Sequence, residues 1–200
     1  MGEQMSRRER KKQQSRKAIL DAAVEVFSRK GFRDASVADI MRAAALGIGT
    51  FYNYFNSKEE ILMSLLGRLS EEVVDALGEL RAANRPSAEL LAAGSRITAK
   101  FLDENRFVLP LFLSGSEDSA MPEGMAGKIE MTPRFKPVFA SIIRQGQEQG
   151  EFRDDVPAEL IAEMFHSIYQ AASFSKLSLS FQENVALKTR ILLDGICLPK

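Results

Sequence analysis

Several residue types that support chemistry are scarce in this chain. Its 200 residues include a single cysteine, Cys197, a single histidine, His166, and no tryptophan. One cysteine excludes a disulfide within the chain, and one histidine argues against a transition-metal site, because such sites draw on several Cys or His ligands. The sequence also lacks a Gly-rich phosphate loop. We therefore expect no cofactor, no metal and no enzyme, although an active site built only from carboxylates stays open.

Long apolar runs are absent too. The longest, Val108–Leu113, contains Pro110 and is far shorter than the roughly 20 residues that cross a bilayer. The first residues are polar and basic, without the apolar region of a signal peptide. These absences predict a cytoplasmic protein that makes no membrane contact.

The net charge is zero, but the charges are unevenly divided along the chain. Residues 1–58 carry 12 basic and 6 acidic side chains, whereas residues 59–200 carry 15 basic and 21 acidic ones. Basic residues are densest over Arg7–Lys17, where Glu9 is the acidic exception. This asymmetry favours a basic module that binds a polyanion, joined to a module with another task. We predict a flexible basic arm over residues 1–14, which either contacts phosphates or is simply solvated.

Hydrophobic periodicity predicts an all-α chain with no sheet. A helix from Ser15 to Lys30 would end at Gly31, which can take a left-handed conformation. Ser36 with Asp39, and Ser57 with Glu60, have the spacing of capping boxes that open two further helices. A short helix over Thr50–Phe55 would lie between these two. The later predicted helices are Arg85–Leu113, Pro133–Gly150, Ala158–Leu177 and Gln182–Leu198, and residues 114–137 are predicted as a largely irregular connection.

The first three predicted helices have the order of a helix-turn-helix DNA-binding unit, with the motif at about residues 36–55. The last of them would enter the major groove by its N-terminal end, while Phe51 and Phe55 pack into the core. Asn53 can hydrogen-bond a base edge, and Thr50 can touch a thymine methyl. Tyrosine hydroxyls and Lys58 suit phosphates. The predicted DNA-binding residues are Arg16, Ser36, Ile48, Gly49, Thr50, Tyr52, Asn53, Tyr54 and Lys58.

Four stretches in this order and spacing resemble the N-terminal domain of TetR-family transcriptional regulators. They are Ala18–Gly31, Ser36–Ile40, Gly49–Phe55 and Ser57–Leu62. The resemblance covers about residues 15–70. It implies a DNA-binding domain over residues 15–75 and a helical domain over 76–200 that binds a small ligand and pairs with a second copy. The chain departs from the family at Ala45, where the turn usually holds glycine, and at Gly47, where a serine-like cap is frequent.

The second domain is rich in phenylalanine, which favours an apolar effector such as a drug-like, aromatic or acyl compound. Arg96, Lys100 and Arg106 could meet an anionic group on it, and residues 146–152 also resemble the family's regulatory domain. The predicted ligand-binding residues are Phe101, Phe107, Phe112, Met121, Met125, Phe139, Phe165 and Arg106. Two apolar stripes on the last two helices predict a dimer interface of Ile161, Met164, Phe165, Ile168, Ala172, Val185, Ile191, Leu192 and Ile196.

These observations predict a dimeric, ligand-responsive transcriptional regulator, most simply a repressor that a small apolar effector releases from a palindromic operator. The expected partners are double-stranded DNA, a second copy of the chain and the effector. Two alternatives stay open, namely an activator and an architectural protein that binds DNA without sequence specificity. Replacing Tyr52 or Asn53 separates the last alternative from a regulator, because a nonspecific protein would depend on residues 1–17 instead.

Overall fold

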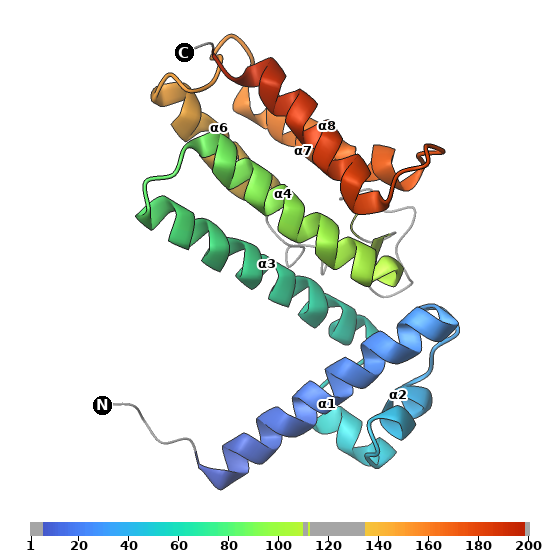
Figure 1. Ribbon diagram of the computed structural model, residues 1–200. Helices are drawn as coiled ribbons and strands as arrows, with labels where there is room; N and C mark the ends of the chain where they lie inside the picture. The colour runs from blue at the N-terminus through green and yellow to red at the C-terminus, as the bar shows by residue number, and fades with distance from the viewer. Residues whose placement is uncertain (1–5, 110–111, 113–134, 199–200) are drawn as a thin grey trace. The chain divides into compact units, whose positions relative to one another are not determined.

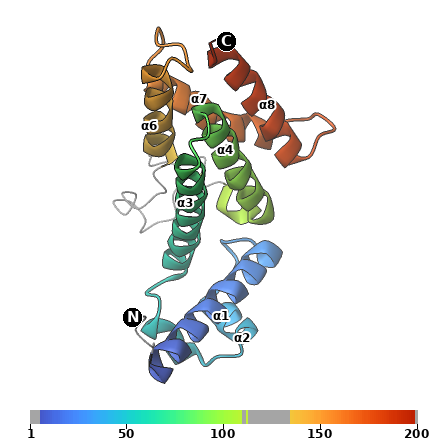
Figure 2. The same cartoon turned by 60° about the vertical axis from the view of Figure 1, so that its left-hand side comes forward.

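The computed structural model describes residues 6–109, 112 and 135–198, and Figures 1 and 2 show that these residues are mostly helical. Within these residues no strand forms, and an isolated bridge pairs Phe152 with Cys197. The all-α prediction is confirmed. The chain divides into two compact units, one with the residues up to Leu65 together with Asn105–Val108, the other with Leu66–Glu104 and the residues from Leu109 onward. The predicted domain boundary at residue 75 lies inside a continuous helix.

The first unit begins with a helix that is longer than its apolar pattern indicates. This helix, α1, spans Arg7–Lys30 and starts with a capping box, in which the Glu9 N–H donates to the Ser6 hydroxyl over 3.2 Å and the Ser6 N–H donates to the Glu9 carboxylate over 2.8 Å. The segment predicted as a flexible arm is therefore helical from Arg7 on. The periodicity missed this extension because residues 7–14 are all charged or amide-bearing and leave no apolar stripe.

The next helices form the helix-turn-helix motif. Helix α2 spans Val37–Ala43 and opens with the predicted capping box of Ser36 and Asp39. The turn after it places Ala45 at φ 53°, in the left-handed region that glycine usually fills. The following helix, η1, spans Ile48–Asn53 and has 3-10 geometry, so the predicted short helix is present but begins and ends two residues earlier than expected. It begins after Gly47, which offers no side-chain cap.

Aromatic rings build much of the core of this unit. Phe51 and Phe55 are buried, as predicted, with ring centroids 5.9 Å apart. Phe32 folds back after Gly31, and its ring centroid lies 5.1 Å from that of Phe27. The other face of Phe27 contacts Phe107, at 5.2 Å, in the short helix η2 (Arg106–Val108). Phe107, which is half-buried, therefore packs onto the first unit, as part of the same short helix as the predicted ligand-binding residue Arg106.

The second unit consists of packed helices. It contains most of α3 (Lys58–Ala82), together with α4 (Ser87–Glu104), α6 (Phe135–Glu148), α7 (Ala158–Ser173) and α8 (Phe181–Ile196). Helix α4 lies against both α6 and α8, and α7 lies against the same two helices (Figures 1 and 2). The approach of α4 to α6 is tight at Gly94, where an added Cβ would lie 2.8 Å from the Phe139 ring.

Helix ends in the second unit differ from the predicted ones. Helix α4 ends at Glu104, whereas the apolar pattern extends to Leu113, because the chain turns at Asn105 into η2. Helix α7 ends at Ser173, which leaves Phe174 and Leu177 exposed in the connection to α8. Residues 113–134, with the predicted ligand-binding residues Met121 and Met125, lie outside the described residues.

The stretch of residues 146–152 joins three parts of the second unit. The N–H groups of Glu151 and Phe152 both donate to the Gly146 carbonyl, over 2.8 and 3.2 Å. The Phe152 ring covers Gly146 so closely that a Cβ there would lie 2.3 Å from it. The Glu151 carboxylate accepts a 2.7 Å hydrogen bond from the Ser87 N–H at the start of α4, and the Leu198 N–H donates to the Glu151 carbonyl. This stretch therefore has a structural role.

Candidate nucleic-acid interface

Helix η1 buries one side and presents the other to solvent. The Phe51 side chain is fully buried, whereas 56% of Ile48 and 66% of Tyr52 are exposed. Asn53 and Gly49 are also exposed, while Thr50 and Tyr54 are half-buried. The outer surface of this helix therefore offers an aliphatic group, an aromatic ring and an amide next to a glycine that allows close approach of the backbone. These groups match the hydrogen-bonding and methyl-contacting chemistry of the major groove.

Backbone hydrogen bonds stabilise the turn between α2 and η1, and this turn sets the orientation of η1. The Leu46 N–H donates to the Met41 carbonyl over 3.0 Å, closing the end of α2 around Ala45. The Thr50 N–H then donates to the Gly47 carbonyl over 2.9 Å and starts η1. With Phe51 buried, the short helix is fixed from both its ends and its inner face.

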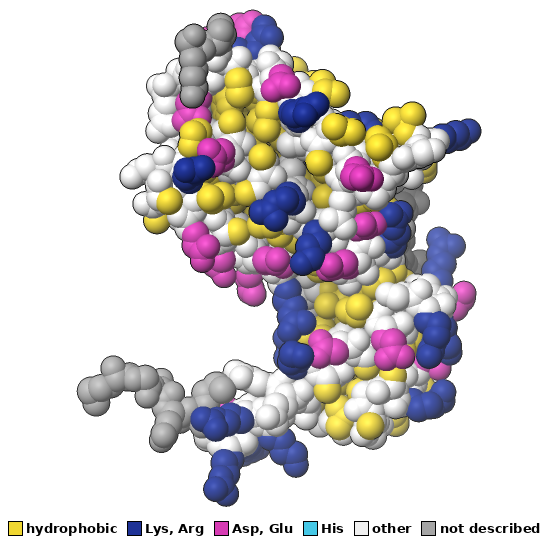
Figure 3. Space-filling model, viewed as in Figure 1, with side chains coloured by type: hydrophobic (Ala, Val, Ile, Leu, Met, Phe, Trp, Pro, Cys, Tyr) yellow, Lys and Arg dark blue, Asp and Glu magenta, His cyan; other side chains and the backbone are white. Residues whose placement is uncertain are grey.

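The basic residues near the N-terminus project from a helix. Figure 3 shows Lys and Arg side chains gathered at the first turns of α1. Hydrogen bonding to the Ser6 side chain and then to the Ser6 backbone N–H lowers the pKa of Glu9 below its usual value, so the acidic residue of the segment is engaged as a cap. The exposed cations of these turns are Arg7, Arg8, Arg10, Lys11 and Lys12. Helical spacing gives them fixed directions that suit a row of phosphates.

Arg16 makes contacts within the protein and is also accessible to an anion from outside. Its guanidinium lies 5.1 Å from the centroid of the Phe55 ring and donates to the Ser64 hydroxyl over 3.2 Å. These contacts tie α1 to α3 within the first unit. The residue is nonetheless exposed, so the predicted contact with DNA is compatible with its geometry.

Two other predicted DNA-binding residues are engaged within the protein. The Ser36 hydroxyl donates to the Asp39 carboxylate over 2.7 Å and accepts from the Asp39 N–H over 3.1 Å. The Lys58 ammonium donates to the carbonyl oxygens of Phe32, Arg33 and Ala35 over 2.8, 2.9 and 2.9 Å. The structure thus groups the η1 residues on one surface but turns Lys58 toward the protein.

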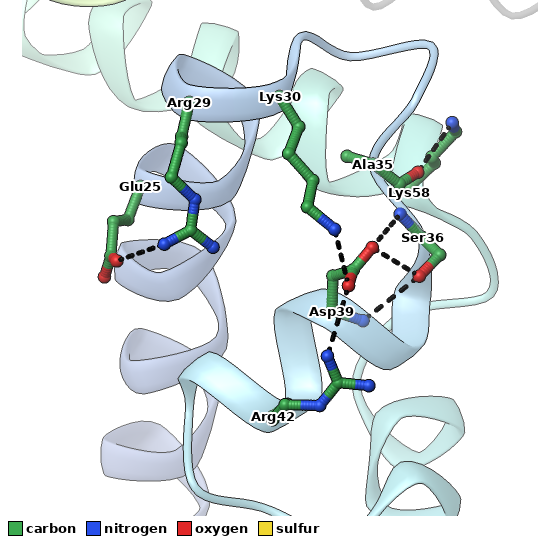
Figure 4. Close-up of polar contacts among 8 residues, drawn as sticks. All are labelled: Glu25, Arg29, Lys30, Ala35, Ser36, Asp39, Arg42 and Lys58. Carbon is green, nitrogen blue, oxygen red and sulfur yellow. Dashed lines mark hydrogen bonds and ion pairs between the residues drawn. The ribbon is translucent and has the colours of Figure 1, made fainter.

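Asp39, in the first turn of α2, has a carboxyl group whose pKa is strongly shifted by its neighbours. Asp39 pairs with Lys30 at 2.8 Å and with Arg42 at 3.5 Å, as Figure 4 shows. The hydrogen bond from Lys30, followed by those from Ser36, holds the pKa of Asp39 far below its usual range. The spacing of a capping box predicted the contact of Asp39 with Ser36. The ion pair of Asp39 with Lys30 depends on the turn between α1 and α2, and the sequence alone did not indicate it.

An apolar groove runs along α7 and α8 in the second unit. Its volume is about 520 Å³, and Met164 and Ile191 on its walls are exposed by 47% and 68%. Six of the nine residues predicted for the dimer interface line it: Ile161, Met164, Ile168, Ile191, Leu192 and Ile196. Phe165, Val185 and Ala172 are instead buried within their own chain.

A second cavity lies between α4 and α8, next to Leu80 at the end of α3. Its volume is about 470 Å³, and alanine and other aliphatic side chains form most of its walls. Its polar lining residues are Glu89, Ser95, Arg96, Gln182 and Thr189, and Glu89 is paired with Arg85. Sequence reasoning missed this cavity because small alanines give no stronger signal than an ordinary helix face. A cavity of this size is within the range that holds small ligands.

The predicted ligand-binding aromatics form a packed interior. The Phe139 ring meets the Phe165 ring edge-on at 5.4 Å, and Phe112 contacts His166 and Tyr169. The space between them is only about 10 Å³. Burial lowers the pKa of His166, with a smaller effect of Lys136, and burial raises the pKa of Tyr169 to about 12. The aromatic rings of this interior therefore act as core.

The remaining predicted ligand contacts are dispersed. Phe101 lies half-buried on α4, and Arg106 is exposed in η2 within the first unit. In the part of the chain that the structure describes, three or more His, Cys, Asp or Glu side chains are nowhere grouped as metal ligands. None of the helices in those same residues combines the length and apolarity needed to cross a membrane.

The fold and these surfaces define a class of protein in which a helix-turn-helix unit is joined to a helical regulatory unit. Residues 19–65 match the family model of bacterial regulatory proteins of the tetR family. The HTH-type transcriptional repressor KstR2 of Rhodococcus jostii is 24% identical over 145 residues, which cover 72% of this chain and 71% of that protein. The fatty acid metabolism regulator protein of Bacillus subtilis is 24% identical over 87% of this chain and 90% of its own length.

A solved structure has the same fold. The Thermus thermophilus FadR repressor, crystallised in complex with lauroyl-CoA, superposes with a TM-score of 0.64 at 24% identity and covers 92% of this chain and 96% of its own. Together, these findings show that residues 19–65 match the DNA-binding region of the tetR family and that the chain is similar to TetR-type transcriptional regulators over most of its length. Its relatives are regulators and not enzymes, in agreement with the expectation from composition.

Proposed function

We propose that the protein is a homodimeric repressor that reads a palindromic operator with η1 and releases it when an apolar effector binds the second unit. The observation that carries this proposal is the two-sided η1 helix. Tyr52 and Ile48 are displayed to solvent directly beside the fully buried Phe51. Exposing an aliphatic and an aromatic side chain on a short helix costs solvation free energy, and a groove contact with bases accounts for it.

The α7–α8 groove supports dimerisation through these helices. An apolar surface with Met164 and Ile191 exposed is unfavourable in water, and a second copy related by a two-fold axis would cover both grooves at once. Two copies also place two reading helices on one DNA, which suits half-sites about one helical turn apart.

The α4–α8 cavity is our candidate effector site. Its aliphatic walls suit a hydrocarbon body, and Arg96 suits an anionic or strongly polar head. The bound lauroyl-CoA of the Thermus protein makes a fatty acyl thioester the first compound to test. Linkage requires that the effector bind the DNA-free form more tightly than the DNA-bound form, because otherwise it could not lower the affinity for DNA.

Selection from a random DNA library at near-physiological salt tests the DNA-binding part. We expect enrichment of a palindrome, and we expect Tyr52→Ala and Asn53→Ala to abolish the enrichment while the proteins stay folded. A nonspecific architectural protein would give no enriched sequence, would be insensitive to both substitutions and would lose affinity when residues 1–17 are removed.

Sedimentation equilibrium of Ile191→Glu tests the dimer. A charge in the centre of the interface should weaken dimerisation by more than about tenfold. Val74→Glu is the matched control, because Val74 is a 53% exposed apolar residue on α3 that does not line the groove. Equal behaviour of the two variants would place the interface elsewhere.

Calorimetric titration with lauroyl-CoA tests the effector site. Arg96→Ala should weaken binding, whereas Lys100→Ala, one turn later on α4 and paired with Glu104, should leave it unchanged. If lauroyl-CoA binds both variants like the unchanged protein, the cavity is not the effector site. If it does not bind the protein at all, the acyl thioester class is wrong, while the DNA-binding proposal is unaffected.

A further inference from the structure

The first residue of α3 uses all of its hydrogen-bonding capacity inside the protein. An ammonium group has three N–H donors, and Lys58 directs one to each of three backbone carbonyls, those of Phe32, Arg33 and Ala35, at 2.8–2.9 Å. The same ammonium lies 4.8 Å from the centroid of the Phe32 ring, a distance typical of cation–π contacts. This geometry leaves no donor for a DNA phosphate.

The three carbonyls belong to the connection between α1 and α2. Ala35 is buried and directly precedes Ser36, the N-cap of α2. On the other side of that cap, Asp39 pairs with Lys30 in the last turn of α1. The start of α2 is therefore held by two cations that come from different helices, as Figure 4 shows. Loss of Lys58 would leave three carbonyl groups without this partner, and loss of Lys30 would remove the shorter of the two ion pairs of Asp39.

We propose that Lys58 is a positioning residue, which fixes the start of α2 and through it the orientation of the reading helix η1. Helix α2 packs against η1, and the turn between them contains only four residues, Ala44–Gly47, so a rotation of α2 moves η1 with it. Lys58 then contributes to recognition of base sequence and not to the sequence-independent attraction of phosphates. This inference rests on the proposed function, since it requires a sequence-specific DNA-binding protein.

The salt dependence of DNA binding distinguishes a lysine that contacts a phosphate from a lysine that positions α2. Each phosphate contact contributes about 0.9 to the slope of log affinity against log salt concentration, because a counterion is released. We would measure Lys58→Met, which keeps the length of the apolar stem, on the selected operator and on random-sequence DNA over a range of salt concentrations, well below the melting temperature.

For Lys58→Met, we expect operator affinity to fall by about tenfold or more, comparable to the loss of one base contact. Affinity for random DNA should stay within about twofold, and the salt slope should stay unchanged. A phosphate contact would instead lower both affinities and reduce the slope by about 0.9. A purely stabilising role would leave both affinities unchanged at this temperature. Either of these last two results overturns the proposal.

Lys12→Met is the matched control, since it makes the same change at an exposed position of α1. If Lys12 contacts a phosphate, the Lys12→Met substitution should lower the affinities for operator and random DNA and also reduce the slope of log affinity against log salt concentration. Lys58→Arg should restore only part of the operator affinity, because a planar guanidinium cannot direct three donors to carbonyls spaced for an ammonium. Failure of the unchanged protein to select any DNA would refute the proposed function, whereas selection with a normal Lys58→Met variant would refute this inference alone.

Discussion

The two units of the chain hold their functional surfaces in different ways. In the first, short helices are fixed by capping boxes, by Lys58 and by the Asp39 pairs, so the outer face of η1 can be exposed and still rigid. In the second, long apolar helices pack closely at Gly94 and Gly146 and leave an open groove and a cavity between them. In the proposed function, recognition of DNA would therefore depend on a few contacts around α2 and η1, whereas binding of effector and partner would depend on surfaces that several distant segments create together.

The largest expected change in stability tests whether η1 buries Phe51 and exposes Tyr52. Phe51→Ala removes a fully buried ring and should cost about 3–5 kcal/mol of unfolding free energy, measured by urea denaturation. Its neighbour Tyr52 is 66% exposed, so Tyr52→Ala should change stability by no more than about 0.5 kcal/mol. Equal losses for the two variants would mean that η1 does not display Tyr52.

Close packing in the second unit predicts the next effect. Gly146→Ala places a Cβ against the Phe152 ring, and the forced movement should cost about 1–3 kcal/mol. Gly78→Ala on α3 meets no atom within 4 Å and should instead stabilise the helix by about 0.5–1 kcal/mol. Thermal denaturation should show a lower melting temperature for Gly146→Ala and a higher one for Gly78→Ala. A higher melting temperature for Gly146→Ala would contradict the close contact between Gly146 and the Phe152 ring.

The left-handed turn of the first unit offers a gain in stability. Ala45 has φ 53°, so Ala45→Gly should stabilise the unit by about 1 kcal/mol. Ala44 has helical dihedral angles, with φ −72°, and Ala44→Gly should destabilise by about 0.5–1 kcal/mol. Denaturation midpoints that move in the same direction would show that the turn has another conformation in solution.

The smallest effect concerns the interior of the second unit. Burial raises the pKa of Tyr169 to about 12, above the ordinary value of about 10. The folded state therefore holds a proton that the unfolded state releases, and stability falls as pH rises from about 10 toward 12. An ultraviolet titration of tyrosinate should show this late step. Tyr169→Phe should remove it and change neutral-pH stability by no more than about 1 kcal/mol, because within the described residues the hydroxyl lies near those of Ser95 and Thr98 without a hydrogen bond of ordinary geometry.

Features set by neighbouring residues could be predicted from the sequence. The Ser36–Asp39 box, the turn at Gly31 and the burial of Phe51 and Phe55 follow from spacing over a few positions, and all are present. The extension of α1 to Arg7 escaped prediction because a polar helix has no periodic signal.

Features set by tertiary contacts could not be predicted. Lys58 meets carbonyls 23–26 positions earlier, and Phe107 packs into the first unit because the chain returns to it at residues 105–108. The α4–α8 cavity exists because small side chains on two distant helices face each other. Which residues of an apolar helix become core, groove or cavity is decided by its neighbours, and only the structure supplies these.

The central claim is that the exposed face of η1 reads base sequence. The most direct test is the ratio of dissociation constants for the selected operator and a scrambled duplex of equal length, measured by fluorescence anisotropy at one near-physiological salt concentration. The account predicts a ratio of about 1,000 or more, which collapses in Tyr52→Ala. A ratio near one, with affinity that falls steeply as salt rises, would show that the basic turns of α1 alone bind DNA and would contradict the claim.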